Sequence, residues 1–558
     1  MKYNGVTATN PKELANLFSA YFRSVYIQPD NIQYDSRVPI HNDINVCNVF
    51  VDSNIVFNIL IDLDVNKGAG PDMIPPVFLC NCSPTLAVPL SYIYNLSLST
   101  GVFPATWKFA NITALFKNGS RNEVSNYRPI SGLSCAAKVL EKIVTKVVFD
   151  SFHSGISIYQ HGFFSGRSCH TNLSVFSNFL ATSLDAGMQV DAIYFDFQKA
   201  FDRVNHQILL HKLELHGIGP PLLSWFKSYL ENRIQVVNIA GVMSDEIHVS
   251  SGVPQGSHLG PVLFLLFIND LCEVFVHSRF LFFADDLKIY NIVKNTDDCH
   301  LLQSDINRLT RWCTANMMQL NTSKCKVISF SRKKIPTLFD YTIDESEILR
   351  VTTVNDLGVL FDSELRFVNH VDWIVSKAFR MLGFIMRQCC EFKNVEVLKT
   401  LYFSLVRSHL DYCCMIWSPI YRTHVTRIER VQIKFANFLL FKLKIDKSLL
   451  THNHRLNILG LESLEKRRIK LILSFGHKLL INQIDCPDLL SLLNFRVPSR
   501  TTRQSDTFLI NYSRTDIGKN EVIGKFMSYY NTLIPQEFDY NNCKPLTFKK
   551  KLKKLLDV

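Results

Sequence analysis

The 558-residue sequence lacks any hydrophobic run long enough to cross a membrane. Its longest apolar stretch, Pro261 to Ile268, falls far short of the roughly 20 residues that a transmembrane helix needs. The N-terminal segment mixes polar, charged and proline residues and has no apolar core of signal-peptide length. These absences argue against secretion and membrane insertion. They predict an intracellular protein, in the nucleus, the cytoplasm or both.

The fifteen cysteines show neither the spacing of a zinc site nor that of a disulfide framework. No Cys-x-x-Cys pair is accompanied by a second pair, or by histidines, at zinc-finger distance. Close pairs such as Cys80 and Cys82 are too isolated to complete a tetrahedral site, and the odd total argues against a closed set of disulfides. We therefore expect free thiols in a reducing compartment.

Internal repeats and low-complexity tracts are also absent, and the composition, 47% hydrophobic and 20% charged, is that of an ordinary globular protein. The net charge of +12 favours a polyanionic partner. Basic residues gather toward the C-terminus, at Arg422, Arg427, Arg430 and Lys434, at Lys466, Arg467, Arg468 and Lys470, and in KKKLKK at residues 549–554. Any one cluster is equally well explained as a solvated helix face, and KKKLKK equally well as a nuclear signal. Their sum suits a surface that follows phosphates.

Two adjacent carboxylates, Asp285 and Asp286, lie within FLFFADDLKIY at residues 280–290, between apolar runs that predict the arms of a β-hairpin. Adjacent acids at a tight turn repel one another, and a divalent cation or water relieves that repulsion. Because solvated turn aspartates are common, the pair alone does not establish a metal site.

A third carboxylate, Asp196, ends the apolar strand in DAIYFDFQKAFDRV at residues 191–204. Alternation along the strand places Ala192 and Tyr194 on the same face as Asp196, and Lys199–Val204 has helical character. The opposite face is formed by Ile193, Phe195 and Phe197. Three carboxylates brought together suit two Mg²⁺ ions about 3.5 to 4 Å apart, which activate an attacking hydroxyl and stabilise a leaving pyrophosphate. The implied reaction is nucleotidyl transfer.

A further segment, SGVPQGSHLGPVLFLLFINDL at residues 251–271, predicts a glycine-containing turn that leads into an apolar helix. In chain order, FDFQKAFD, GVPQGS and FADD resemble motifs A, B and C of reverse transcriptases, and their details are similar to the non-LTR retrotransposon (LINE, jockey-like) branch. Segments that resemble the finger motifs of that branch lie at residues 66–75, 101–120, 126–134 and 160–173, and segments that resemble motifs D and E lie at residues 311–332 and 355–371. The resemblance covers most of the chain.

The resemblance implies a polymerase site that holds two Mg²⁺ ions, with Mn²⁺ as the alternative. Asp196 and Asp285 would bind both ions, and the backbone carbonyl of Phe197 would complete one coordination shell. Asp286 would bind metal nearby, more through its charge than as a direct ligand.

Six residues are implied to contact the substrates: Lys117, Arg128, Phe201, Gln255, Gly256 and Lys324. Lys117 and Arg128 match finger positions that hold the triphosphate. Phe201 matches the aromatic position under the incoming sugar, where a ring fills the space that a 2′-hydroxyl would need. Gln255 and Gly256 would contact the template side of the nascent base pair. Lys324 would place a positive charge near the pyrophosphate. The alternatives are a core phenylalanine and solvated surface cations.

Two positions depart from the pattern of that branch. Ala114 replaces a usual proline and His258 replaces a usual small residue, and altered packing is the expected effect of both. Trp312, Trp417 and His370 are expected to be structural. Relatives usually carry an apurinic-type endonuclease before the polymerase, whereas the first finger motif here begins at residue 66. The chain is therefore expected not to nick its own target.

The expected fold is α+β, a right-hand polymerase with fingers, a palm built on a mainly antiparallel sheet, a thumb and a helical C-terminal extension. The expected regions are a helical N-terminal extension at 1–66, fingers at 67–190, palm at 191–362, thumb at 363–440 and a basic helical region at 441–558, with the reverse transcriptase domain at about 98–362. Helices are predicted at 11–26, 84–100, 398–417 and 424–440.

The leading interpretation is an RNA-directed DNA polymerase that adds dNTPs to a DNA 3′-hydroxyl. Its partners would be an RNA template, a DNA primer or target, and dNTPs, with no membrane and no obligate protein partner. One alternative is a non-catalytic nucleic-acid-binding remnant of a retrotransposon. Another, a polymerase similar to group II intron maturases, is disfavoured by KAFD, RPISGLS and LGV in their sequence contexts.

Overall fold

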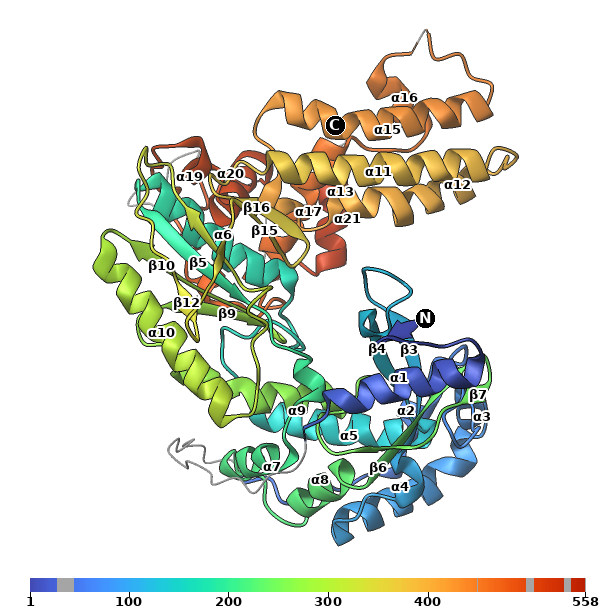
Figure 1. Cartoon of the computed structure of the whole chain (residues 1–558). Helices are drawn as coiled ribbons and strands as arrows, with labels where there is room; N and C mark the ends of the chain where they lie inside the picture. Colours follow the sequence, from blue (N-terminus) through green and yellow to red (C-terminus); the bar gives the residue numbers. More distant parts are fainter. Residues whose placement is uncertain (28–44, 449, 498–505, 536–542, 557–558) are drawn as a thin grey trace.

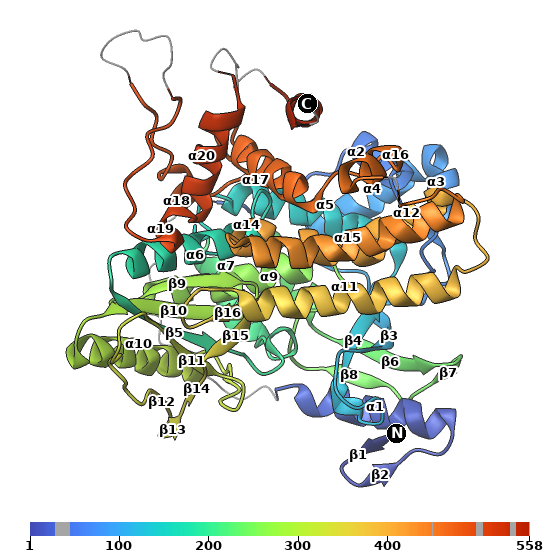
Figure 2. The same cartoon turned by 90° about the horizontal axis from the view of Figure 1, so that it is seen from above.

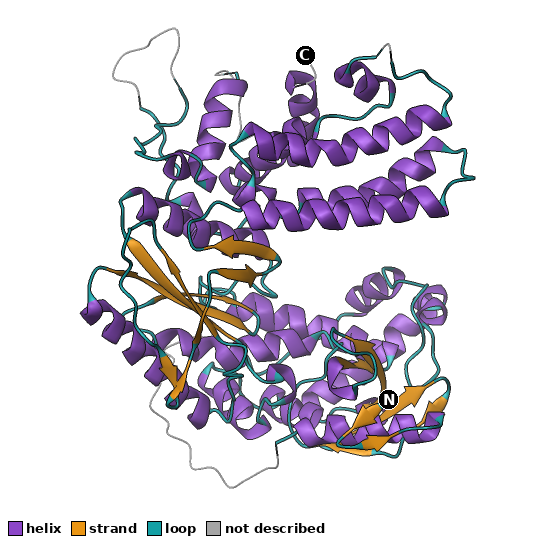
Figure 3. Ribbon diagram, turned by 45° about the horizontal axis from the view of Figure 1, so that its top comes forward, coloured by secondary structure: helices purple, strands orange, loops and turns teal. Residues whose placement is uncertain are grey.

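The structure, a computed structural model, describes residues 1–27, 45–448, 450–497, 506–535 and 543–556. Parts of the terminal regions expected at 1–66 and 441–558 therefore lie outside the described residues. The strands gather in separate groups, whereas the C-terminal part is helical (Figure 3). Helices and sheets are thus both present, as expected, and two five-stranded sheets carry the segments singled out by the sequence.

The first sheet contains the strands that carry the candidate carboxylates. Its strand order is β14-β11-β5-β10-β9, with bounds Leu349–Arg350, Lys326–Phe330, Gln189–Phe195, Asp286–Val293 and Arg279–Phe283. Each pairing is antiparallel except that of β11 with β14. The β-hairpin predicted around residues 280–290 is confirmed as β9 and β10, and its second strand pairs directly with β5.

Both faces of this sheet are buried, but in different cores. Ile193 and Phe195 pack with α9 (Leu259–Ile268) and α10 (Thr296–Ala315), whereas Ala192 and Tyr194 face the core that contains α6 (Cys169–Asp185). Figures 1 and 2 show α6 and α10 on opposite sides of the sheet. The alternation predicted along β5 is confirmed, because successive side chains of a strand enter opposite faces.

The second sheet has the order β4-β3-β6-β7, and β8 pairs with β6. The bounds are Tyr127–Gly132, Phe109–Phe116, Arg233–Ile239, Val242–Met243 and Ile247–Val249. β3 and β6 run parallel, although β5 of the first sheet separates them in the sequence. Strands β6 to β8 fall in the interval expected for the palm, yet they pair with a strand of the interval expected for the fingers.

The predicted N-terminal helix is confirmed as α1 (Pro11–Val25), and it packs across β6 of the second sheet. Leu17, Phe18 and Phe22 are buried there with Ile112 and Val237. The sequence pattern assigned no chemistry to α1. Its position makes it a cover for the second sheet.

Six further helices are described in the N-terminal half, namely α2 (Ser53–Ile61), α3 (Pro76–Asn81), α4 (Ser83–Thr100), α5 (Cys135–Phe152), α7 (His206–Leu215) and α8 (Leu222–Leu230). The helix predicted at 84–100 is confirmed as α4. Three two-stranded hairpins complete the strands, β1 (Lys2–Tyr3) with β2 (Val6–Thr7), β12 (Thr342–Ile343) with β13 (Ser346–Glu347), and β15 (Thr353–Asp356) with β16 (Val359–Asp362).

Helices form the C-terminal part, where α11 and α15 lie side by side (Figure 2). The bounds are α11 Val368–Gln388, α12 Val395–Tyr402, α13 Ser408–Asp411, α14 Cys414–Trp417, α15 Arg422–Lys442, α16 His452–Ile458, α17 Leu464–Leu480, α18 Pro487–Leu490, α19 Asp516–Lys519, α20 Val522–Leu533 and α21 Pro545–Leu556. The helix predicted at 424–440 is confirmed as α15. The stretch predicted as one helix at 398–417 is broken, because Cys413 adopts a left-handed backbone with φ of 48°.

No helix within the described ranges is both long and apolar enough to span a bilayer. All fifteen cysteines are free thiols, and most of them are buried.

Candidate active site

The candidate carboxylates meet at one end of the first sheet. Leu287 of β10 lies opposite Phe195 of β5 in the last pair of the register, and Asp286 and Asp196 are the residues next to that pair along each chain segment. Asp286 and Asp196 line one cavity of about 540 Å³. Asp285 lies in the turn between β9 and β10, beside Asp286. We call this group of Asp196, Asp285 and Asp286 the carboxylate site.

The turn that carries Asp285 is held by the segment Tyr159–Gly162. The Gln160 side-chain oxygen accepts hydrogen bonds from the backbone N–H groups of Ala284, at 3.0 Å, and Gly162, at 2.8 Å. Ala284 has a left-handed backbone with φ of 56°. A Cβ atom on Gly162 would lie 2.3 Å from the Ala284 nitrogen, so only glycine allows this approach. Sequence reasoning missed the role of Gln160, although it singled out the motif that contains it.

Replacing Gln160 by alanine is expected to loosen this turn without unfolding the chain. The two backbone donors would lose their acceptor, at a cost of about 1–3 kcal/mol for each buried donor left unpaired. Amide hydrogen exchange in the peptide that contains Ala284 should accelerate by roughly 10-fold or more, since about 1.4 kcal/mol corresponds to a factor of ten. The exposed Gln198 provides the control Gln198→Ala, which should leave this exchange unchanged. Equal exchange in both variants would contradict the role given to Gln160.

Charge repulsion and burial act together on the two turn carboxyls. Burial raises the pKa of Asp286 to about 6, and the neighbouring charges of Asp285, Asp356 and Asp196 add to the rise. Burial also raises the pKa of Asp285, with Asp196 contributing in the same direction and the cations Arg128 and Lys117 opposing it. The ionised carboxylates are therefore held close together at a free-energy cost that a bound cation would relieve.

Basic side chains approach the carboxylate site from the second sheet and from the segment before β11. Lys324 forms an ion pair of 3.0 Å with Asp196. Lys117 follows β3, and Arg128 lies on β4, where it is exposed. Desolvation lowers the pKa of Lys117, and the charges of Arg128 and Lys324 lower it further, against the opposing effect of Asp196. The structure thus brings Lys117, Arg128 and Lys324 into one positive group beside the carboxylates.

The donor atoms at the carboxylate site fit hard divalent cations such as Mg²⁺ and Mn²⁺, which prefer carboxylate oxygens. Within the described ranges, however, no three His, Cys, Asp or Glu side chains are arranged closely enough to enclose a metal ion. Asp196 instead pairs with Lys324. Phe197 is buried and bridges to Leu320, which fixes the backbone directly after Asp196. Coordination by all three carboxylates would therefore require a shift of side chains.

The two segments that resemble motifs A and B hold each other through their backbones. The N–H of Val253 donates to the carbonyl of Phe201 at 2.9 Å, and the N–H of Gly252 donates to that of Val204 at 2.7 Å. The helical character expected for Lys199–Val204 is confined to one 3-10 turn, at Ala200–Asp202. Neighbouring backbone supplies the partners that a helix would otherwise provide.

The predicted residues Phe201, Gln255 and Gly256 lie in this joint. The Phe201 ring is partly buried and stacks on Phe264 with centroids 4.3 Å apart. Gln255 donates from its side chain to Asp202 at 2.7 Å, and its carbonyl accepts from the N–H of Ser131 in β4. Gly256 has φ of 114°, a conformation that favours glycine. These residues thus lie between the two five-stranded sheets, where the segments that resemble motifs A and B meet.

Asp202 was not predicted as a site residue, although it lies within the segment FDFQKAFD. It is buried, and burial raises its pKa to about 6, while its hydrogen bond with Gln255 lowers it. The signal available in the sequence was the position of Asp202 directly after Phe201, at the end of this segment. Its contact shows that it orients Gln255.

A buried polar network lies behind the carboxylate site, and sequence reasoning missed it too. Lys288 of β10 forms an ion pair of 2.5 Å with Asp356 of β15, and the Tyr194 hydroxyl donates to the same carboxylate at 3.1 Å. Tyr194 and Lys288 are each two residues from a site carboxylate on the same strand face. The network therefore joins the carboxylate site to the β15–β16 hairpin.

The remaining residues named from the sequence have structural surroundings. Ala114 lies opposite Pro129 in β3 and β4, and His258 donates its backbone N–H to Glu141 at 2.9 Å. Trp312, Trp417 and His370 are buried. The structural roles expected for these last three are confirmed.

Comparisons with known proteins agree with the motifs. The model of the family "Reverse transcriptase (RNA-dependent DNA polymerase)" matches residues 116–386. The chain is 28% identical over 408 residues to a probable RNA-directed DNA polymerase from transposon X-element of Drosophila melanogaster. This alignment covers 69% of this chain and 43% of that protein. It is also 28% identical over 366 residues to the RNA-directed DNA polymerase from mobile element jockey of Drosophila funebris, which covers 62% of this chain and 39% of that protein.

Among solved structures, the chain aligns with apo telomerase from Candida tropicalis, truncated from its C-terminal domain, with a TM-score of 0.32 and 13% sequence identity. The alignment covers 49% of this chain and 59% of that chain, and the likeness is weak. The chain spans less than half the length of the X-element and jockey proteins. Its matched segment includes the carboxylate site and the cations beside it. Residues 116–386 are therefore similar to the reverse transcriptase family, and the chain is similar to the RNA-directed DNA polymerases of the X-element and jockey mobile elements.

Proposed function

We propose that the chain is an RNA-directed DNA polymerase that transfers dNTPs onto a DNA 3′-hydroxyl. The observation that carries this proposal is that the register of β5 and β10 ends at the pair Phe195–Leu287, so that Asp196 and Asp286 follow at this end of the sheet and line one cavity, with Asp285 in the adjoining turn. Positive side chains face this end, as a triphosphate substrate requires. The names of the relatives, which are RNA-directed DNA polymerases of mobile elements, support the same activity.

We assign the expected regions to the lobes of a right-hand polymerase on this basis. The first sheet would be the palm, the second sheet with α1 to α4 the base of the fingers, and α11 to α15 the thumb. Under this assignment the fingers would include β6 to β8, which lie beyond residue 190 in the sequence. An RNA template and a DNA primer would lie between these lobes.

Asp196 and Asp285 would hold two divalent ions, with Asp286 and the carbonyl of Phe197 nearby. Such ions supply the activation of the 3′-hydroxyl and the stabilisation of the leaving pyrophosphate. Lys117 and Arg128 would bind the triphosphate, and Lys324 would exchange its contact with Asp196 for one with phosphate. Phe201 would lie under the incoming sugar and favour dNTPs over rNTPs, because its ring is fixed against Phe264. Gln255, held by Asp202, would contact the template side together with Gly256.

Primer extension with the purified chain tests this function. A DNA primer annealed to an RNA template should be extended with dNTPs in the presence of Mg²⁺ or Mn²⁺, and the product should have the sequence complementary to the template. EDTA should abolish extension, and rNTPs should be poor substrates. Binding of the RNA–DNA hybrid without incorporation under either metal would instead identify a non-catalytic nucleic-acid-binding remnant.

A further inference from the structure

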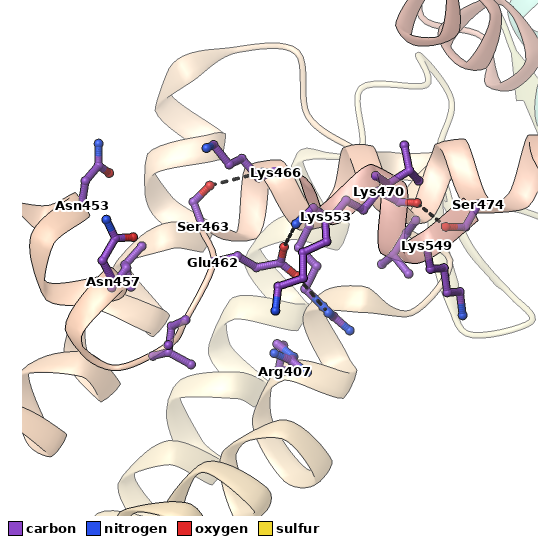
Figure 4. Close-up of a pocket in the computed structure, with 16 residues that line it drawn as sticks. Arg407, Asn453, Asn457, Glu462, Ser463, Lys466, Lys470, Ser474, Lys549 and Lys553 are labelled. Atoms are coloured by element: carbon purple, nitrogen blue, oxygen red, sulfur yellow. Dashed lines mark hydrogen bonds and ion pairs between the residues drawn. The ribbon is translucent and has the colours of Figure 1, made fainter. Parts of the chain in front are cut away.

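A second large cavity lies in the C-terminal helical part, between α16, α17 and α21. Its volume is about 880 Å³, larger than that of the cavity at the carboxylate site. Six basic side chains line it: Arg407, Lys466, Arg467, Lys470, Lys549 and Lys553. Figure 4 labels five of them, all except Arg467, together with Glu462. We call it the C-terminal basic cavity.

Three of the six cations share two acidic neighbours. Arg467 pairs with Asp411 at 2.7 Å and with Glu462 at 3.2 Å, and Lys470 pairs with Glu462 at 2.6 Å. Arg407 lies 3.6 Å from Asp411. These partly buried pairs form the wall of the cavity and fix the N-terminal turns of α17. Because two carboxylates offset three cations, this group adds only one net positive charge to the cavity.

The other three cations keep their charge. The ammonium group of Lys466 donates to the backbone carbonyl of Leu556, and it has no acidic partner among the described residues. Lys549 and Lys553 are exposed on α21, and the described part of the chain provides neither with an ion-pair partner. Because they are four residues apart, they project from one face of the helix.

The position of these lysines is fixed, since α21 is docked on α17. Phe548 and Leu552 of α21 are buried, and the Phe548 ring stacks on His477 with centroids 4.0 Å apart. His477 also bonds to the carbonyl of Cys543, just before α21. The lysines at 549 and 553 therefore face the cavity on a helix that packing holds in place.

We propose that the C-terminal basic cavity binds the phosphodiester backbone of a single nucleic-acid strand. Three ammonium groups without an acidic partner among the described residues can contact phosphates, and the amide side chains of Asn453 and Asn457, one turn apart on α16, add hydrogen-bond donors. The described side chains that line the cavity include no aromatic ring on which a base would stack. Binding should consequently depend on charge rather than on base sequence. The similarity of the same chain to reverse transcriptases makes nucleic acid, rather than an acidic protein, the expected polyanion.

This site goes beyond the proposed polymerase function, because its residues lie on helices outside the matched domain segment at 116–386. A strand held there would be anchored apart from the carboxylate site. Strand binding at the cavity and nucleotide addition at the carboxylate site are therefore separately measurable.

The test compares two double variants of α21 in the full-length chain. Lys549→Gln with Lys553→Gln removes the two charges that face the cavity, whereas Lys550→Gln with Lys554→Gln removes two exposed charges that do not line it. Each chain is titrated against fluorescent single-stranded RNA and DNA oligonucleotides of mixed sequence, at several salt concentrations. The first variant should weaken binding by roughly 10-fold near 0.15 M salt, and should reduce the salt slope by about 1.4, because each lost phosphate contact on a single strand changes it by about 0.7. The second variant should bind within about twofold of the unaltered chain.

A single change on another helix, Lys466→Gln, gives an independent measure and should reduce the slope by about 0.7. Extension of a short, saturating RNA–DNA hybrid should be unchanged in all variants, and thermal unfolding should report an intact fold. Stronger effects on RNA than on DNA, or the reverse, would identify the strand that occupies the cavity. The proposal would be overturned if both double variants weakened nucleic-acid binding equally. It would also be overturned if polyglutamate bound at the cavity lysines while Lys549→Gln with Lys553→Gln left the nucleic-acid affinity unchanged.

Discussion

Replacing Asp285 by asparagine is expected to reduce the rate of primer extension by roughly 10³-fold, equivalent to about 4 kcal/mol of transition-state stabilisation. Asparagine keeps the shape of the side chain and removes the negative charge. The turn itself is held by Gln160 and by the pairing of β9 with β10, so the fold should persist. Single-turnover extension on an RNA template, at saturating primer and dNTP, isolates this loss from effects on binding.

The matched control is Asp297→Asn, which removes a carboxylate from the exposed first turn of α10. Its extension rate should stay within about twofold, since surface substitutions away from a site have small effects. Affinity for the RNA–DNA hybrid should be similar in both variants. Unchanged extension in Asp285→Asn would contradict the assignment of this carboxylate, even if the chain proved to be a polymerase.

Removal of Asp356 should destabilise the protein by about 3–5 kcal/mol, because it would leave a buried charge without its partner. Only 4% of the Lys288 side chain and 6% of the Asp356 side chain are exposed. Burial lowers the pKa of Lys288, and Asp356 opposes this effect. In Asp356→Ala the lysine would also be drawn toward Asp286, its other acidic neighbour, so extension should fall as well. Urea unfolding followed by circular dichroism measures the change in stability.

The double variant Lys288→Met with Asp356→Leu separates the lost charge from lost packing. Replacing both partners by apolar residues of similar size is often neutral, so this variant should recover most of the stability lost by Asp356→Ala. Some loss should remain, because the Tyr194 hydroxyl would lack its acceptor. If the double variant were no more stable than the single one, the ion pair would not be the source of the effect.

The segments with short-range patterns were predictable from the sequence. The alternation in β5, the apolar arms of the β9–β10 hairpin and the amphipathic spacing of α1 and α15 each depend on a few consecutive residues. The order of the acidic motifs indicated that Asp196, Asp285 and Asp286 belong together. It did not indicate their relative geometry, which depends on the register between β5 and β10.

Partners that are distant in the sequence were not predictable. Lys288 lies within the apolar strand β10 and Asp356 at the end of the short strand β15, and neither local pattern indicates the other. Gln160 and Ala284 meet only because the 159–162 segment runs beside β9. The basic clusters show the same limit. Arg468 is buried, and Arg422 pairs with Glu465, so the count of positive residues did not distinguish the lysines that remain available to a ligand.

The parallel pairing of β3 with β6 has a consequence for how the chain is made. During synthesis β3 (Phe109–Phe116) is made long before its partner β6 (Arg233–Ile239), and β5 of the other sheet is made between them. On a nascent chain the second sheet cannot be completed before β8 ends at Val249, and the first sheet cannot be completed before β14 ends at Arg350. Contacts between such distant segments form late and at an entropic cost. A chain that stops before residue 233 therefore lacks strands of both sheets, and it should depend on chaperones rather than fold into a stable half.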